Sequence, residues 1–219
     1  MVIDFHAHIY PQKIAVKASG NIGKFYNVPM CYDGSPEQLI KSGSKIGVSK
    51  YIVHSTATAA RQVESINNYI ISEVNAHGEF VGFGTVHPDY EDFEGELRRI
   101  KSAGLRGVKL HPDFQQFEVD TPTMDPVYET IAALKMPVLV HAGDFRYDFS
   151  GPKRIRNVVE KHATFDKQKR HHEDGLRGHC QRRKHGFENG RGGDNARIIL
   201  RTWKTVSTRN FSTISAAPR

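Results

Sequence analysis

The sequence predicts an α/β fold built on a parallel sheet, because short apolar runs alternate with segments of helical periodicity. The runs are rich in β-branched and aromatic residues and are bounded by glycine or polar residues, which is typical of strands buried on both faces. From the second run onward they begin about 30 residues apart, the length of one strand–helix step. Periodicity alone leaves open whether the sheet is open or closed. The expected strands are residues 2–5, 50–54, 80–84, 107–111 and 137–141.

Helix signals fill the intervals between these strands. Ser35 offers an N-cap, Pro36 suits the first helical position, and Gln38 would complete a capping box. Two later segments have apolar residues at spacings of three and four, which places them on one helical face. These residues are Val63, Ile66, Ile70 and Val74, and then Phe93, Leu97 and Ile100, with Gly104 as a stop. Asp125-Pro126 and Pro152 are expected to open two further helices.

The basic charge of the chain lies in its last quarter. The 219 residues have a formal net charge of +7, yet residues 1–163 hold 18 Lys and Arg against 19 Asp and Glu, while residues 164–219 hold 13 against 5. Between Asp166 and Ala196 apolar residues are too sparse to bury surface that would offset chain entropy. We therefore predict an α/β domain over residues 1–163 and an irregular, disordered basic tail over residues 164–219.

Several protein classes are excluded by composition. No apolar run approaches the ~20 residues that span a bilayer. The first residues place Asp4 and His6 where a signal peptide needs a basic and then an apolar stretch. Two cysteines, Cys31 and Cys180, make no disulfide framework. We expect a soluble cytoplasmic protein with no membrane association.

Histidines follow the expected strands. His6 and His8 are two residues apart in an extended segment, so their side chains share a face and can bind one metal ion at the strand's carboxyl edge. His141 ends the fifth strand and is a candidate third ligand. A single histidine after a strand is more often a polar loop residue, and we interpret His54 and His87 in that way. His111, which ends the fourth strand, fits either interpretation.

Several segments together resemble the amidohydrolase superfamily, and within it the group of aminocarboxymuconate-semialdehyde decarboxylase-like enzymes. They are Ile3-Asp-Phe-His-Ala-His8, Phe83-Gly-Thr-Val-His-Pro-Asp89, Gly107-Val-Lys-Leu-His-Pro-Asp113 and Val140-His-Ala-Gly143. The resemblance runs from residue 1 to about residue 163. It implies a metal-dependent (β/α)8 TIM barrel, usually with zinc, in which His6, His8 and His141 are metal ligands.

The resemblance also implies a reaction class. Members of the group hydrolyse C–N or C–O bonds, or decarboxylate small carboxylic acids, with a metal that activates water or polarises a substrate oxygen. We therefore expect a small-molecule substrate that bears a carboxylate. His111 is a candidate catalytic residue. Lys109, Asp113 and Arg146 are candidates for binding the anionic group, or else are solvated loop charges.

The family pattern breaks after the fifth strand–helix unit. The group continues with an apolar strand that ends in Ala-His-x-Gly-Gly and later with a Gly-x-Asp whose Asp is a ligand and general base, and neither motif is found here. About five units cannot close an eight-stranded barrel. We expect an incomplete barrel with weak or absent activity, whose free edges at the first and fifth strands invite pairing with another chain, as in a homo-oligomer.

Three interpretations of residues 164–219 stay open. A basic arm would make the chain a non-enzymatic nucleic-acid-binding protein, and a His/Cys tract would bind metal, but neither signal is specific. The favoured interpretation is a frameshift or a mis-joined gene model. Arg170-His171-His172 can be encoded by codons that, read one base later, begin Val-Ile, as an apolar sixth strand would.

Overall fold

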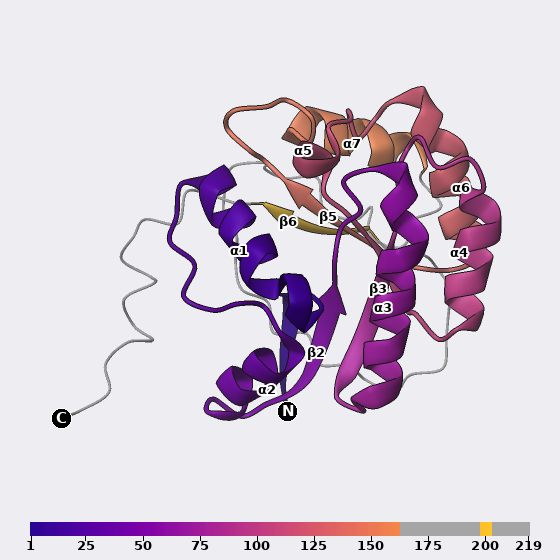
Figure 1. Ribbon diagram of the computed structural model, residues 1–219. Coiled ribbons are helices and arrows are strands. Elements are labelled where there is room, and N and C mark those ends of the chain that lie inside the picture. The colour runs from indigo at the N-terminus through magenta and orange to yellow at the C-terminus, as the bar shows by residue number, and fades with distance from the viewer. Residues whose placement is uncertain (163–197, 203–219) are drawn as a thin grey trace.

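A computed structural model of the chain describes residues 1–162 and 198–202 (Figure 1). The strands are β1 Val2–His8, β2 Val48–His54, β3 Phe80–Thr85, β4 Gly107–Leu110, β5 Val138–Ala142 and β6 Ile198–Thr202. The α-helices are α1 Gln12–Tyr26, α2 Pro36–Ser44, α3 Val63–Ala76, α4 Phe93–Ser102, α5 Pro112–Gln115, α6 Asp125–Ala133 and α7 Pro152–Lys161, with 3-10 turns η1 Ala60–Gln62 and η2 Pro122–Met124.

The described strands form one parallel sheet in chain order, β1-β2-β3-β4-β5-β6. Helices α3, α4 and α6 lie side by side along one face of this curved sheet (Figure 1). Parallel strands joined in sequence by helices on the outer face are the arrangement of an α/β barrel, and six strands leave it incomplete. The predicted fold class, an incomplete (β/α)8 barrel, is confirmed.

The sixth strand corrects two expectations. Residues 198–202 lie in the segment predicted to be irregular, yet they form β6, which pairs with β5 from Val138 opposite Ile198 to Ala142 opposite Thr202. Ile198, Ile199 and Leu200 supply the short apolar run that is typical of a strand, and β6 is the last strand in the described sheet order. The edge of β5 expected to be free is therefore paired. Residue 168, where a sixth strand was expected, lies outside the described residues.

The main hydrophobic core lies between the sheet and the outer helices. Tyr51 and Val53 of β2, and Val138 and Val140 of β5, point to this side and pack with apolar residues of α3, α4 and α6. Glycines in β3 let the helices approach closely: an added Cβ at Gly82 would lie 2.6 Å from Cδ2 of Leu105 and 2.9 Å from Cγ2 of Ile70. The helices therefore rest almost on the backbone of β3.

The opposite, inner face of the sheet has a smaller apolar cluster. It contains Ile52, Phe83 and Leu139, which alternate with the core residues along their strands. The same alternation places polar residues toward the inner face near the strand ends. These inner positions are His6, His8, His54, Lys109 and His141.

The predicted helices form where capping and periodicity place them. The Oγ of Ser35 accepts a hydrogen bond from the backbone N–H of Gln38 at 3.3 Å, so α2 begins as expected. Gly104, at φ +96°, follows the end of α4. Helix α1 was not predicted. It contains two glycines and begins at Pro11 without a side-chain N-cap, and it ends at Asn27, whose φ of +52° turns the chain.

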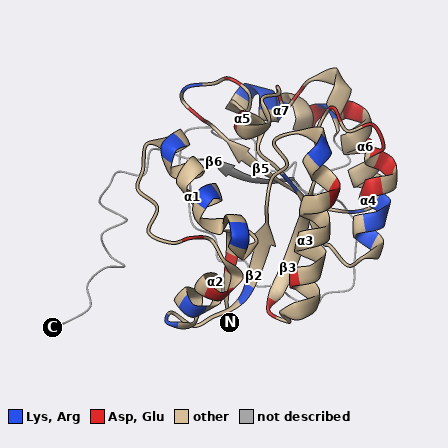
Figure 2. Ribbon diagram, in the orientation of Figure 1, with Lys and Arg blue, Asp and Glu red and all other residues tan. Residues whose placement is uncertain are grey.

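The charge distribution agrees with the near-neutral composition of the first 163 residues. Figure 2 shows basic and acidic residues of both signs on the helices, while β2 and β3 are largely uncharged. None of the helices in the described part of the chain is both long and apolar enough to cross a bilayer.

Replacing Ile70 with alanine tests the outer core. Ile70 is fully buried on α3 against β3, whereas Ile14 on α1 is 50% exposed. We expect Ile70→Ala to lower the free energy of unfolding by about 2–4 kcal/mol, through lost burial and a cavity. The matched control Ile14→Ala should change it by less than about 0.5 kcal/mol. Urea denaturation measures both, and equal effects would contradict the described packing.

Candidate functional site

The carboxyl ends of four strands bring histidines to one edge of the inner face. His8 ends β1, His54 ends β2, His111 follows β4, and His141 lies in β5. Parallel strands expose their carboxyl ends at the same edge, which is where α/β barrels have their chemistry. The histidines gather there in two groups.

The first group, here called the three-histidine group, consists of His6, His8 and His54. One ring nitrogen from each lies within 4.8 Å of the others. The Nε2 atoms of His6 and His8 are 3.3 Å apart, and the ring of His54 stands edge-on to both, with centroid distances of 4.6 Å and 4.4 Å. Three converging imidazoles are a donor set suited to a divalent metal ion.

His54 is the most buried member of this group. Its side chain has no exposed surface, and neither ring nitrogen has a hydrogen-bond partner among the described residues. Burial lowers the pKa of His54 well below its ordinary value, and neighbouring His8 and Lys109 lower it further. The imidazole is therefore neutral and keeps a lone pair available for a ligand.

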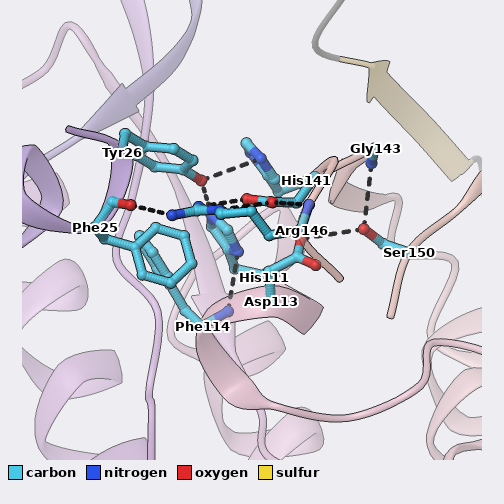
Figure 3. A network of polar contacts seen from close by, with 10 residues as sticks. Phe25, Tyr26, His111, Asp113, Phe114, His141, Gly143, Arg146 and Ser150 are labelled. Carbon is cyan, nitrogen blue, oxygen red and sulfur yellow. Dashed lines mark hydrogen bonds and ion pairs between the residues drawn. The ribbon is translucent and has the colours of Figure 1, made fainter. Parts of the chain in front are cut away.

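The second group joins His111 and His141 to the end of α1. The hydroxyl of Tyr26 lies 3.0 Å from Nε2 of His111 and 3.2 Å from Nε2 of His141 (Figure 3). The two imidazoles stack at 4.0 Å, and the ring of Phe114 stacks on His111 at 3.8 Å. Tyr26 thus bridges two strand-end histidines from a helix that follows β1.

The hydrogen bonds of this second group indicate which ring nitrogen of His111 carries the proton. Nδ1 of His111 accepts from the backbone N–H of Phe114 at 3.4 Å, and burial together with His141 lowers the pKa of His111, so its ring is neutral. A neutral ring that accepts at Nδ1 has its proton on Nε2, which then donates to the Tyr26 oxygen.

Arg146 holds α1 over this edge. Its guanidinium forms a bidentate ion pair with Asp144, at 2.9 Å and 2.6 Å, and also donates to the backbone carbonyl of Phe25. The guanidinium carbon lies 4.1 Å from the centroid of the Phe25 ring. Figure 3 shows Arg146 between Phe25 and the loop after β5. The Arg146 guanidinium is therefore bonded to protein groups beside the site, Asp144 and the carbonyl of Phe25.

Asp113 lies on α5 beside the same edge and is buried. Its Oδ2 accepts from the Ser150 hydroxyl at 3.1 Å, and Ser150 accepts from the Gly143 backbone N–H at 3.3 Å (Figure 3). Burial, with a smaller contribution from Asp144, raises the pKa of Asp113 to about 6 against the opposing effects of Ser150 and Arg146. Its carboxyl therefore changes charge just below neutral pH.

The structure shows where the predicted site residues lie and which of them lie together. His6 and His8 lie together as expected, but His54 completes their group, while His141 lies with His111 and Tyr26. Lys109 is fully buried on the inner face of β4 and Asp113 is 1% exposed, so the alternative of solvated loop charges is wrong for both. His87 is a turn residue whose Nδ1 accepts from the Asp89 backbone N–H, as expected.

Two contributors were missed by the sequence analysis. His54 ends its strand as His141 does, and that common position was the available signal. Tyr26 has no comparable signal, because its contribution depends on how α1 packs across the strand ends. The His/Cys tract from His171 to His185 lies outside the described residues.

Residues 3–177 match the family model described as amidohydrolase, so the match continues beyond residue 163. A comparison with curated proteins gives no match. Among solved structures, 5-carboxyvanillate decarboxylase LigW from Sphingomonas paucimobilis has a TM-score of 0.51 at 17% identity, over 75% of this chain and 62% of that one. An uncharacterised TIM-barrel protein from Bordetella bronchiseptica has 0.51 at 16%, over 74% and 61%.

A third structure is 5-carboxyvanillate decarboxylase LigW2 from Novosphingobium aromaticivorans, a D314N mutant with bound manganese and a nitrobenzoic acid. Its TM-score is 0.51 at 17% identity, over 74% of this chain and 55% of that one. At these identities the likeness concerns the fold. The chain spans about 55–62% of the lengths of these three proteins.

Replacing Asp113 with asparagine tests the electrostatics of the site. The folded protein holds the Asp113 proton more tightly than the unfolded chain, whose ordinary value is 3.8, so stability falls as pH rises from about 4 to about 6. Asparagine does not ionise, and we expect Asp113→Asn to raise the free energy of unfolding at pH 7 by about 2 kcal/mol, with the gain gone at pH 4.

Urea denaturation of parent and variant at pH 4, 5, 6 and 7 measures the difference. Asp89→Asn is the matched control, because the Asp89 side chain is 83% exposed, and its effect should stay within about 0.5 kcal/mol. A gain for Asp113→Asn that does not depend on pH would contradict the raised pKa.

Proposed function

Because this chain belongs to the amidohydrolase family, we propose that it performs metal-dependent hydrolysis or decarboxylation of a small molecule that bears a carboxylate. The observation that supports this most directly is the convergence of imidazoles at the carboxyl edge of the sheet, where the Nε2 atoms of His6 and His8 lie 3.3 Å apart. Two imidazole nitrogens at this distance can bind one metal ion between them.

The residues present fit a divalent metal ion. His6 and His8 would hold it, and the family resemblance adds His141. Neutral imidazole nitrogens favour zinc over magnesium or manganese, which prefer oxygen ligands, so we propose zinc. When bound, the ion supplies Lewis-acid chemistry that makes water nucleophilic near neutral pH or polarises a substrate oxygen.

Lys109 is the residue we propose for binding the substrate carboxylate. Its side chain is fully buried on the inner face of β4, close enough to His54 and His111 to lower the pKa of both. A buried ammonium attracts an anion much more strongly than a solvated one. Arg146, predicted for the same task, is committed to Asp144 and Phe25 and is proposed to hold α1 in place.

Aromatic side chains beside His111 favour a flat substrate. Phe25 and Phe114 meet edge to face at 4.5 Å, and Phe114 stacks on His111. A planar aromatic or lactone carboxylate could lie against such a wall, and two solved structures with this fold are named carboxyvanillate decarboxylases. His111, with its ring neutral and its Nε2 proton directed to Tyr26, is the proposed acid–base group.

Residues 1–163 are proposed to form the functional domain, and residues 164–219 a separate segment. Among the described residues, the inner-face histidines and the side chains that contact them lie before residue 163, while β6 sets the backbone of Arg201 beside His141. Of the later segment, the structure describes only β6, which extends the sheet.

Removing His6 and His8 tests metal binding. Purified protein loaded with Zn²⁺ should retain roughly one equivalent after desalting, and the double variant His6→Ala/His8→Ala should retain less than about 0.1, because the site loses two donors. His77→Gln, at the end of α3, is the control and should match the parent. Mass spectrometry measures the zinc content of each protein, and full zinc retention by the double variant would refute the proposed site.

Replacing Lys109 with methionine tests the carboxylate site. Methionine keeps the length and apolar stem but removes the charge, so the affinity of zinc-loaded protein for benzoate should fall roughly 10- to 100-fold. Lys153→Met, at an exposed position on α7, should leave the affinity unchanged. Isothermal titration calorimetry measures the dissociation constants, and equal affinity in parent and Lys109→Met would contradict the assignment.

A further inference from the structure

We propose that His54 is the third protein ligand of the metal, so that strands β1 and β2 form a complete three-imidazole site without His141. This inference rests on the proposed metal-dependent function and specifies which side chains bind the ion. It places the whole donor set within the first 54 residues of the chain.

The sheet register fixes the three histidines relative to one another. His8 and His54 are direct partners in the pairing of β1 with β2. The backbone N–H of Ile9 donates to the carbonyl of His54 at 3.1 Å, and the Ser55 hydroxyl bonds to the carbonyl of Ile9. The register of β1 is irregular between Asp4 and Ala7, and the Nε2 of His6 lies 3.3 Å from that of His8. The group is therefore held by backbone hydrogen bonds rather than by flexible side-chain contacts.

The burial of His54 is unexplained without a ligand. An imidazole with no exposed surface and no hydrogen-bond partner for either ring nitrogen among the described residues loses its hydration without compensation. Each such buried polar atom destabilises the folded protein. The ring stands edge-on to both His6 and His8, and one of its nitrogens lies within 4.8 Å of theirs. A metal ion bound between these nitrogens would offset that cost.

His141 is engaged elsewhere. Its Nε2 lies 3.2 Å from the Tyr26 hydroxyl, and its ring stacks on His111 at 4.0 Å with an interplanar angle of 9°. To bind an ion at the three-histidine group, His141 would have to break the Tyr26 hydrogen bond and leave the stack. His54 needs neither change. The geometry therefore favours His54 as the ligand. His141 stays with Tyr26 and His111 in the second group.

The proposed donor set has a chemical consequence. Three neutral imidazoles leave the full +2 charge of the ion uncompensated, whereas a carboxylate ligand would reduce it. Such a site selects zinc or cobalt over magnesium and manganese and keeps a fourth tetrahedral position open. The uncompensated charge and buried Lys109 would together attract an anionic ligand to the inner face.

Zn²⁺ affinity of the full chain, measured by competition with a chromophoric chelator, tests the inference. We expect His54→Ala to raise the Zn²⁺ dissociation constant at least about 100-fold and His141→Ala to change it less than about threefold. Circular dichroism and thermal denaturation of the metal-free proteins confirm that each variant folds. Substituted Co²⁺ gives a second readout, because the visible absorption of its tetrahedral site should be lost in His54→Ala and kept in His141→Ala.

The outcomes separate this inference from the proposed function. Tight Zn²⁺ binding by the parent that survives His54→Ala but is lost in His141→Ala would overturn the role of His54 and leave the metal-dependent function standing. A parent that binds no Zn²⁺ would overturn both. Should His54→Ala not fold, the parent labelled with ¹⁵N-histidine is decisive: Zn²⁺ should shift the ring nitrogens of His54 and not those of His141, and the reverse pattern would refute the inference.

Discussion

The pairing of β1 with β2 is the constraint on which the candidate site depends. A parallel register that sets His8 opposite His54 brings imidazoles from two distant parts of the chain into contact, and the alternation along β1 adds His6. A shift of one residue would turn one strand's histidine toward the outer helices, among Ala7 and Val53. Because the later strands add to the sheet in chain order, the position of every other site residue follows from this first pair.

The second part of the site is assembled by a different kind of interaction. Tyr26 reaches His111 and His141 from α1, the first of two helices between β1 and β2, and this helix is held by the contacts of Arg146 with Asp144 and Phe25. Side-chain bonds at a partly exposed loop are weaker and more mobile than a sheet ladder. The three-histidine group is therefore the more rigidly held part of the site.

Most of the fold was predictable because its information is local. Buried strands need short apolar runs, and α2 needs its N-cap at Ser35, so each of these elements can be recognised within a few residues of sequence. The placement of His54 was not predictable in this way, since it depends on the register between strands 46 residues apart. Helix α1 was missed for a related reason: it has two glycines and no side-chain N-cap, and tertiary contacts at Tyr26 fix its position. The strand β6 was missed because its apolar run is short and follows a long polar stretch.

The cost of burying polar groups is concentrated at one edge of the sheet. His54, Lys109 and Asp113 are almost completely buried on or beside the inner face, whereas the outer face of the same strands packs apolar residues against helices. A purely structural inner face would be more stable with aliphatic side chains, as Ile52 and Leu139 show further along the same strands. Local rules of packing are broken mainly at functional sites, where ligand binding offsets the cost. The inner carboxyl edge is therefore the part of the molecule whose composition is explained by a bound ligand rather than by the fold.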